Sequence, residues 1–494
     1  MKGKNTPEKT KNVEKAREEQ KMGEKTIEKN AITEGVIWKQ LLIFFFPIML
    51  GTLIQQLYTT VDTIIVGRFV GKAALASVGG PAAVLSTIVV TFFNGLANGA
   101  AVIIAQYYGA KDRKSLHVGL HTAYLFSIVI SLIVSLVGTV LTPWLLTIMN
   151  TPQDMMADST IYLRIYFMGI LFTLVYNMGA AIMRAVGDSR RPLLYLLVCC
   201  VMNIILDIVM VVGMKMGIAG AALATVISQC VSAILVTWSL TRAYDAMKLK
   251  FRELRMDARV LKKELKIGVP GALQACAYGV TNVVIQASVN SFGTDTAAGW
   301  AAYGKLDLIF WTVSSALGAA VTTFAGQNYG AKKFDRIKDG VFASMVYCII
   351  SWGLGLAFCL GLGVPMTGLF LNGASGEAAA YYSEMINYSM EFLIYQSIFY
   401  PCLGIIFIYR NTLQGIGKSA VTTIAGVTEL AGRSVTAFIL VKYIGYVGVC
   451  LSNPIAWVAA DIFLLATYYI TMRKYKEKGE YSIKSLLLRK KQLN

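Results

Sequence analysis

The sequence predicts an all-α polytopic membrane protein with twelve transmembrane helices in two parallel, pseudo-twofold-related six-helix bundles. Three observations predict this class. The 494 residues are 56% hydrophobic and 15% charged, with a mean hydropathy of +0.58, which exceeds the values of water-soluble domains. Apolar runs long enough to cross roughly 30 Å of hydrocarbon recur from Leu41 to Thr471. Short patterns then recur at matching places in the two halves, so the bilayer is the expected surroundings of most of the chain.

The apolar windows define the expected helices, and the charged segments between them define the domains. The helices are predicted at 40–66, 77–108, 118–146, 161–183, 193–213, 218–240, 267–292, 297–329, 341–365, 383–409, 421–441 and 448–471. The expected domains are a charged cytoplasmic tail at 1–36, an N-terminal bundle at 37–240, a basic linker at 241–266, a C-terminal bundle at 267–471 and a basic tail at 472–494.

The charge pattern predicts orientation rather than a nucleic-acid partner. The net charge is +18, but Lys and Arg lie in short connectors and tails and not on one folded face. The connectors alternate between basic and weakly acidic, so the positive-inside rule places both termini and the basic linker in the cytoplasm of a multi-pass protein of the inner or plasma membrane. The tail at 1–36 has too few apolar residues to form a core and is expected to be disordered or weakly helical.

The two halves of the chain repeat each other. QYYGAK ends the second predicted helix and QNYGAK ends the eighth, a proline stands early in the first and seventh helices, and VGDS near 187 matches IGKS near 417. Because each half has an even number of helices, the repeats run parallel, and two such bundles can rock about a central cavity. The motif residues are Pro47, Gln106, Gly109, Pro270, Gln327 and Gly330.

Three segments resemble the multidrug and toxic compound extrusion (MATE) family: QYYGAKD at 106–112, GQNYGAKKFDR at 326–336 and VDTIIVGRFVGKAALASVG at 61–79. The resemblance covers nearly the whole chain beyond the charged tail. It implies a V-shaped pair of six-helix bundles that exchanges a cytosolic organic compound, often a cationic drug or toxin, for external H⁺ or Na⁺. It also implies a single working chain whose partners are a small organic molecule and the lipid bilayer, with no cofactor besides the coupling ion.

Two carboxylates stand within membrane helices of the N-terminal half, where ionisable groups are costly and mark ion or substrate paths. At 1.5 Å per residue, Asp62 lies about 7 Å and Asp207 about 9 Å inside the outer ends of their helices. Asn203 is one turn below Asp207, and Thr225 lies about 12 Å from the start of its helix. Two carboxylates in one pocket of low dielectric cannot both ionise easily, so the pair is a candidate proton carrier. The alternative is that both merely hydrogen-bond neighbouring helices.

The resemblance supports a proton site at this carboxylate pair, and the sequence departs from the family pattern at one other place. Members described as proton-coupled have an Asp in helix 1 and an N-x-x-x-D in helix 5, matched here by Asp62, Asn203 and Asp207, while Thr225 and Tyr162 match polar partners of that cluster. Members described as sodium-coupled have a Glu shortly after the proline of helix 7, but Pro270 is followed by GALQACAYGV. A Na⁺ site of that type is therefore not expected, while carbonyl and carboxylate oxygens around Asp62 and Asp207 keep Na⁺ as the alternative coupling ion.

Fewer residues of the C-terminal half receive a role from the sequence. Gln55, Gln274 and Asp307 are the candidates for the substrate cavity, with a hydrogen bond to a neighbouring helix as the alternative for Asp307. Glu429 and Arg433 are spaced i, i+4 and are expected to form a structural ion pair. No metal site is expected, because the eight cysteines occur in or beside apolar runs without a CxxC or a nearby His.

Three other classes of membrane protein fit the sequence less well. An ATP-driven pump would need a phosphate-binding G-x-x-x-x-G-K-[ST] loop, which the sequence lacks. A membrane-embedded enzyme would need catalytic groups near an interface, and the only histidines, His117 and His121, stand beside a cytoplasmic connector. A flippase for lipid-linked precursors would carry several cations in its cavity, whereas the central candidates here are mainly acidic, with Arg164 and Arg433 as the exceptions.

Overall fold

The computed structural model describes residues 31–243, 245–370 and 378–477, and the regular structure within these ranges is helical. Eleven of the described helices are long and apolar enough to cross a membrane. The twelfth long helix, α10 (Ala258–Asn290), is outside that set and begins in a run of charged residues. The expected tail segments 1–30 and 478–494 lie outside the described residues.

Within the described residues each half of the chain contributes six long helical segments, and eleven of the twelve predicted windows fall within them; the window 267–292 runs two residues beyond the end of α10 at Asn290. The N-terminal bundle consists of α3 (Ile37–Phe69), α4 (Lys72–Ser77) continued by η1 (Val78–Ala82) and α5 (Ala83–Gly109), α6 (Arg113–Ile148), α7 (Gln153–Ala185), α8 (Arg190–Asp207) continued by η2 (Ile208–Gly213), and α9 (Gly217–Thr241). The C-terminal bundle consists of α10, α11 (Thr294–Gly330), α12 (Phe334–Phe370), α13 (Ala378–Gly415), α14 (Ser419–Val435) with η5 (Thr436–Leu440) and α15 (Val441–Ile444), and α16 (Tyr446–Cys450) with α17 (Ser452–Glu477).

Local chemistry fixes several helix ends, and one pair of them is at equivalent places in the two bundles. Asp112 accepts the N–H of Ser115 at 3.1 Å and caps α6, while Asp257 accepts the N–H groups of Arg259 and Val260 and caps α10. After α5 and α11 the chain turns through Lys111 and Lys332, both in the left-handed region with φ of 57° and 58°. The repeated GAK motif therefore ends the second helix of each bundle in the same backbone conformation.

The outer faces of both bundles are apolar. Leu136, Phe342 and Leu354 are among many large hydrophobic side chains left exposed, which is the surface that a hydrocarbon solvent requires. Inside each bundle a large core of buried residues packs mainly among its own helices. Among the described residues each repeat has its own large core, and two smaller clusters join α3 to α11 and α5 to α10 across the bundles.

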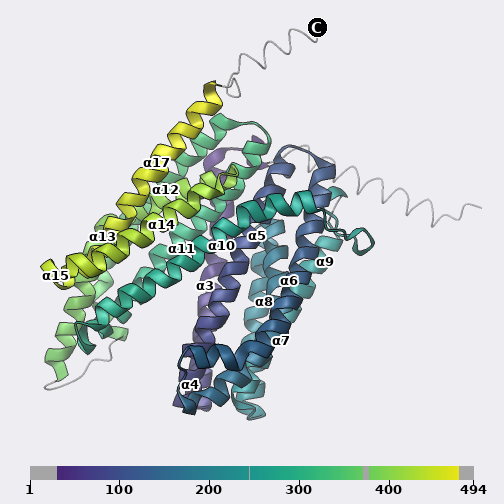
Figure 1. The fold of residues 1–494 in the computed structure, drawn as a ribbon. Helices are drawn as coiled ribbons and strands as arrows, with labels where there is room; N and C mark the ends of the chain where they lie inside the picture. Colours follow the sequence, from purple (N-terminus) through teal and green to yellow (C-terminus); the bar gives the residue numbers. More distant parts are fainter. Residues whose placement is uncertain (1–30, 244, 371–377, 478–494) are drawn as a thin grey trace, which may run out of the picture.

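The bundles meet at one end of the molecule and diverge toward the other (Figure 1). The helices α5 and α10 lie against each other through small residues: a Cβ on Gly95 would collide with Ala272, and one on Gly99 would collide with Gly268. Glycine and alanine allow this close backbone approach, which larger side chains would prevent. The end where the bundles meet also carries the linker between α9 and α10 and is called the linker end below.

Two glutamines hold the linker end across the pseudo-twofold axis. Gln106 of α5 donates through Nε2 to the carbonyl of Gly415 at the end of α13, at 2.8 Å. Gln327 of α11 donates to the carbonyl of Ala185 at the end of α7, at 2.7 Å. The last carbonyls of a helix have no partner within that helix, so each glutamine satisfies one of them from the opposite bundle.

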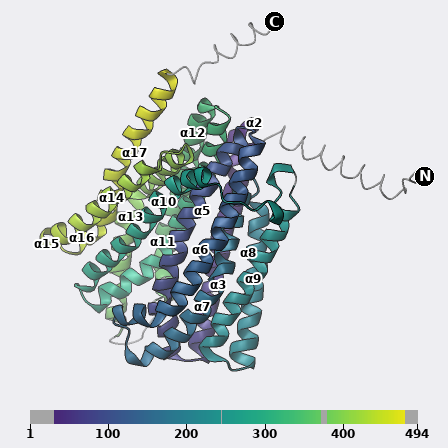
Figure 2. The same ribbon diagram turned by 45° about the vertical axis from the view of Figure 1, so that its right-hand side comes forward.

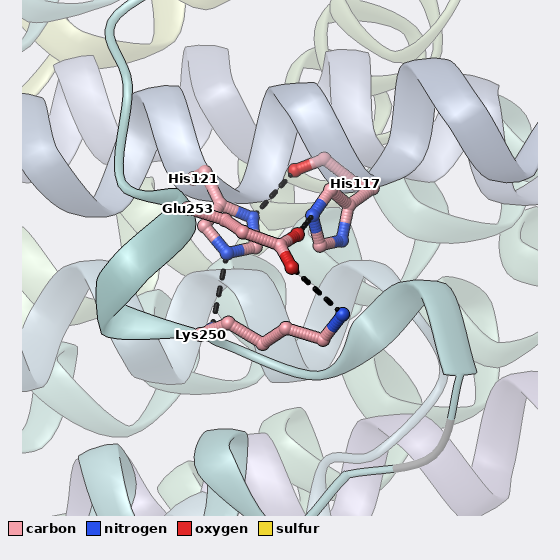
Figure 3. A network of polar contacts seen from close by, with 4 residues as sticks. All are labelled: His117, His121, Lys250 and Glu253. Carbon is pink, nitrogen blue, oxygen red and sulfur yellow. Dashed lines mark hydrogen bonds and ion pairs between the residues drawn. The ribbon is translucent and has the colours of Figure 1, made fainter.

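The linker is fastened to α6 by the two histidines (Figure 3). His117 Nε2 lies 2.8 Å from the carboxylate of Glu253 in the short helix η4 (Phe251–Glu253), and Lys250 Nζ lies 2.9 Å from the same carboxylate. His121 Nδ1 faces the carbonyl of His117 at 2.8 Å, and its Nε2 faces the N–H of Lys250 at 3.1 Å. A neutral ring protonated at Nδ1 satisfies both contacts.

The last residues of the expected tail are ordered. The short helix α2 (Ala31–Glu34) buries Ile32 against α3 and α11. Arg336 of α12 donates to the carbonyls of Ile32 and Gly35, and Lys333 donates to the carbonyl of Thr33. These contacts join the start of α3 to the C-terminal bundle, and Figure 2 shows α2 close to α12.

Candidate ion site and central cavity

The predicted carboxylate pair comes together inside the N-terminal bundle. Asp62 on α3 is 8% exposed and Asp207 at the end of α8 is fully buried. The two carboxyl groups interact directly with each other. The π-helical segment η2 begins at the residue after Asp207, and such irregular turns are frequent at functional sites in helices.

Donors are scarce around this pair. Within the described part of the chain, no donor reaches either oxygen of Asp207 or Oδ1 of Asp62. The side chain of Asn203, 1% exposed and one turn away on α8, likewise makes no hydrogen bond there. Thr225 donates its hydroxyl to the carbonyl of Ala221 in its own helix at 3.1 Å. Two carboxyl groups in contact satisfy each other only when one carries a proton and donates it, so this geometry suits a shared proton.

Tyrosines separate the carboxylate pair from the space between the bundles. Tyr162, 8% exposed on α7, interacts electrostatically with Asp62, Asp207 and Tyr58. Its ring stacks on that of Tyr166, with centroids 6.2 Å apart. Tyr58, Tyr166 and Thr225 face a cavity between the bundles, so the carboxylate pair lies behind the wall of this cavity.

Two adjoining cavities lie between the bundles, and together they are called the central cavity. Their volumes are about 370 and 350 Å³, and they share wall residues from α5, α7 and α11. The shared residues are Asn94, Asn98, Arg184, Ser315 and Ala319. Both bundles therefore contribute to one site, as the parallel repeats predicted.

Two of the three residues expected in the cavity, Gln55 and Gln274, face it, and the third, Asp307, does not. Gln55 and Pro47 of α3 face the cavity, and Gln274 of α10 faces it from the other bundle. Asp307 does not face it: its half-buried carboxylate accepts a hydrogen bond from the Tyr400 hydroxyl at 2.7 Å within the C-terminal bundle. The alternative expectation for Asp307, a hydrogen bond to a neighbouring helix, is the arrangement found, because the face of α11 that carries Asp307 packs against α13.

Sequence reasoning missed the charged residues of the cavity. Arg184 near the end of α7 and Arg410 on α13 both face it, whereas Arg164, one of the expected exceptions, is exposed on α7. None of the described residues that line the central cavity is Asp or Glu. The internal repeat does mark one of these positions. Arg184 stands three residues before Gly187, and Gln414, which also faces the cavity, stands three residues before the matching Gly417.

The predicted ion pair of α14 is confirmed and is larger than expected. Glu429 Oε2 lies 3.8 Å from Arg433 Nη2, and Glu429 Oε1 lies 3.4 Å from Arg410 Nη1. Arg433 is fully buried and stacks on the ring of Tyr278 with its guanidinium carbon 4.4 Å from the centroid. One carboxylate therefore serves two guanidinium groups. Among the described residues no His, Cys, Asp and Glu cluster could hold a metal ion.

Twelve long helices in two parallel bundles, with a polar cavity between them and buried carboxylates beside it, define a polytopic membrane protein of the transporter class. The MatE family model matches residues 47–209 and 270–439. The chain belongs to this family of MATE proteins, as the sequence motifs indicated.

Curated relatives and solved structures agree with this assignment. The chain is 31% identical over 392 residues to the probable multidrug resistance protein YpnP of Bacillus subtilis, covering 78% of this chain and 84% of that protein. It is 27% identical to the probable multidrug resistance protein YoeA of the same organism, covering 89% and 95%. A crystal structure of a MATE protein in the bent conformation superimposes with a TM-score of 0.83 at 20% identity, covering 91% and 98%.

Proposed function

We propose that this protein is a secondary active antiporter that exports an organic compound across the cell membrane in exchange for H⁺. The observation that carries the proposal is the pairing, inside the N-terminal bundle, of the buried and interacting carboxyl groups of Asp62 and Asp207. The names of its relatives YpnP and YoeA, both probable multidrug resistance proteins, support export of drug-like compounds.

The geometry supports alternating access with the linker end closed. The positive-inside rule assigns the linker end to the cytoplasm, so the bundles diverge toward the outside. In this state a proton from outside reaches the carboxylate pair from the cavity, past Tyr58 and Tyr166. Protonation neutralises the charge that Asp62 and Asp207 bury between α3 and α8. A bound proton shifts the equilibrium between the inward and outward states only if it binds one of them more tightly. Exchange follows if the protonated pair favours the inward state and bound substrate favours the outward one.

The test is transport in proteoliposomes with an imposed pH gradient, followed with fluorescent organic ions of either charge. A pH gradient should drive flux by the wild type, and both Asp62→Asn and Asp207→Asn should abolish the coupling while binding survives. Asp154→Asn, an exposed carboxylate in the first turn of α7, is the matched control and should transport normally. Flux that follows only a Na⁺ gradient would make Na⁺ the coupling ion. Unchanged coupling in both variants would overturn the assignment of the pair.

A flippase for pyrophosphate-linked lipids is the second candidate, because Arg184 and Arg410 supply the cavity cations that such a protein would need. Drug export ranks above it because the relatives that cover most of the chain are probable multidrug resistance proteins. The resemblance implied a cationic substrate, but the charges of the cavity favour a different class.

A further inference from the structure

We propose that the substrate site of this protein is built for an organic anion, an amphiphile whose carboxylate or phosphate group binds between Arg184 and Arg410. The inference rests on the proposed function, because it takes the central cavity as the transport site. It names the charge of the substrate, which the MATE fold leaves open.

The N-terminal side of the cavity carries an uncompensated cation. Arg184 faces both of the two adjoining cavities from the last turn of α7. Within the described residues no carboxylate forms an ion pair with it, and it interacts electrostatically with Tyr176. A guanidinium presents a planar fork of donors that matches carboxylate and phosphate oxygens.

The C-terminal side carries a second arginine at the cavity wall, Arg410, which shares its counter-ion with Arg433. Arg410 and Arg433 share the single carboxylate of Glu429, at 3.4 and 3.8 Å. Arg410 lies over Phe407 and Arg433 lies over Tyr278, and both of these rings face the cavity. Asp307 also interacts with Arg433. Even with Asp307 counted as a counter-ion for Arg433, Arg184 on the opposite side of the cavity has none among the described residues.

The rest of the wall suits the remainder of such a molecule. In the part of the cavity that Arg410 lines, amide side chains that can donate hydrogen bonds face inward from three helices, and aromatic rings offer an apolar surface beside Arg410. The amides are Asn94, Asn98, Gln274, Asn411 and Gln414, and the rings are Tyr278, Trp311 and Phe407. An organic cation would meet two guanidinium groups here and none of the carboxylates that recognise it.

Two dyes with one framework and opposite charge test the proposal by binding to the purified protein in nanodiscs. Fluorescein is an anionic xanthene and rhodamine 123 is a cationic one, so their shared ring system cancels the apolar contribution. Fluorescence anisotropy should show fluorescein binding at least ten-fold more tightly. Arg184→Gln and Arg410→Gln should each weaken fluorescein binding by about ten-fold, the effect of losing one charge-assisted contact.

Three controls keep the result interpretable. Arg164→Gln removes an exposed arginine from the same helix as Arg184 and should leave both affinities unchanged. Arg410→Lys keeps the charge and should restore most of the fluorescein affinity lost in Arg410→Gln. Thermal unfolding of every variant identifies any that fails to fold. Tighter binding of rhodamine 123, or fluorescein affinity indifferent to both Gln substitutions in folded protein, overturns the proposal.

The binding assay separates this inference from the proposed function. Selective fluorescein binding without flux under a pH gradient would refute H⁺ antiport and leave the anion site standing. Flux of rhodamine 123 alone under the gradient would do the reverse. Competition identifies the source of the anion: displacement by a soluble aryl dicarboxylate indicates an organic acid, and displacement by a polyprenyl pyrophosphate alone indicates a lipid-linked phosphate. Either displacement supports an anion site.

Discussion

Gln106 and Gln327 make the same hydrogen bond in opposite directions, each donating its side-chain amide to the last carbonyls of a helix in the other bundle. The acceptors, Gly415 and Ala185, end α13 and α7, two helices that also carry the cavity arginines Arg410 and Arg184. The contact that closes the linker end is therefore joined through a few turns of helix to the proposed substrate site.

Removing these amides should loosen the linker end. Gln106→Ala and Gln327→Ala should each lower stability by about 1 kcal/mol, the usual net value of a hydrogen bond. Hydrogen–deuterium exchange should become faster near the ends of α5 and α11, and most so in the double variant. Gln56→Ala, at an exposed position of α3, is the matched control. Exchange that stays at the wild-type rate in the double variant would show that these bonds do not hold the closure.

The glycines beside these glutamines should be intolerant of a side chain. A Cβ on Gly109 would collide with the carbonyl of Gln327, and one on Gly330 would collide with the carbonyl of Gln106. Gly109→Ala should therefore destabilise the protein by about 1 to 3 kcal/mol, as overpacking does. Gly353→Ala in α12, where a Cβ meets open space, should be neutral or slightly stabilising in the same unfolding assay. Equal midpoints for the two variants would contradict the close approach.

Removing the charge of Asp207 should abolish proton coupling without lowering the stability of the protein. This carboxyl group is fully buried and no donor reaches it among the described residues, so its charged form is costly. Asp207→Asn should unfold at a temperature no lower than the wild type while losing proton coupling. Asp257→Ala, which removes the cap of α10, should instead lower the unfolding temperature. A marked loss of stability in Asp207→Asn would favour the alternative reading, in which Asp207 is a packing group.

The linker contact should weaken in acid. Hydrogen bonds from Lys250 and His117 lower the pKa of Glu253 below its usual value. A lowered pKa in the folded state means that the contact stabilises above the unfolded pKa and is lost as the pH falls through the folded one. Glu253→Gln should unfold at a lower temperature than the wild type at pH 7, and this difference should disappear below pH of about 4. Faster tryptic cleavage at Arg252 and Arg255 at neutral pH is a second readout, and a difference that persists in acid would refute the mechanism.

Hydropathy and repeats alone determined the helices, their parallel duplication and the pairing of Asp62 with Asp207. These features depend on composition along one helix and on its length in a bilayer, which are local properties. The resemblance of QYYGAK to QNYGAK likewise marked the residues that join the bundles. It did not show that each glutamine reaches a helix end of the other bundle.

The charge of the cavity was decided only by the tertiary structure. Asp307 and Arg410 both stand in membrane helices and look alike in a sequence, but packing turns Asp307 toward Tyr400 and leaves Arg410 facing the cavity beside Glu429. Which face of a helix points inward depends on its neighbours, and in a bundle apolar on both its lipid and core faces no periodicity reveals it. The sequence therefore determined that this protein spans a membrane as two repeats, while the packing of the repeats placed arginines at the cavity and carboxylates behind it.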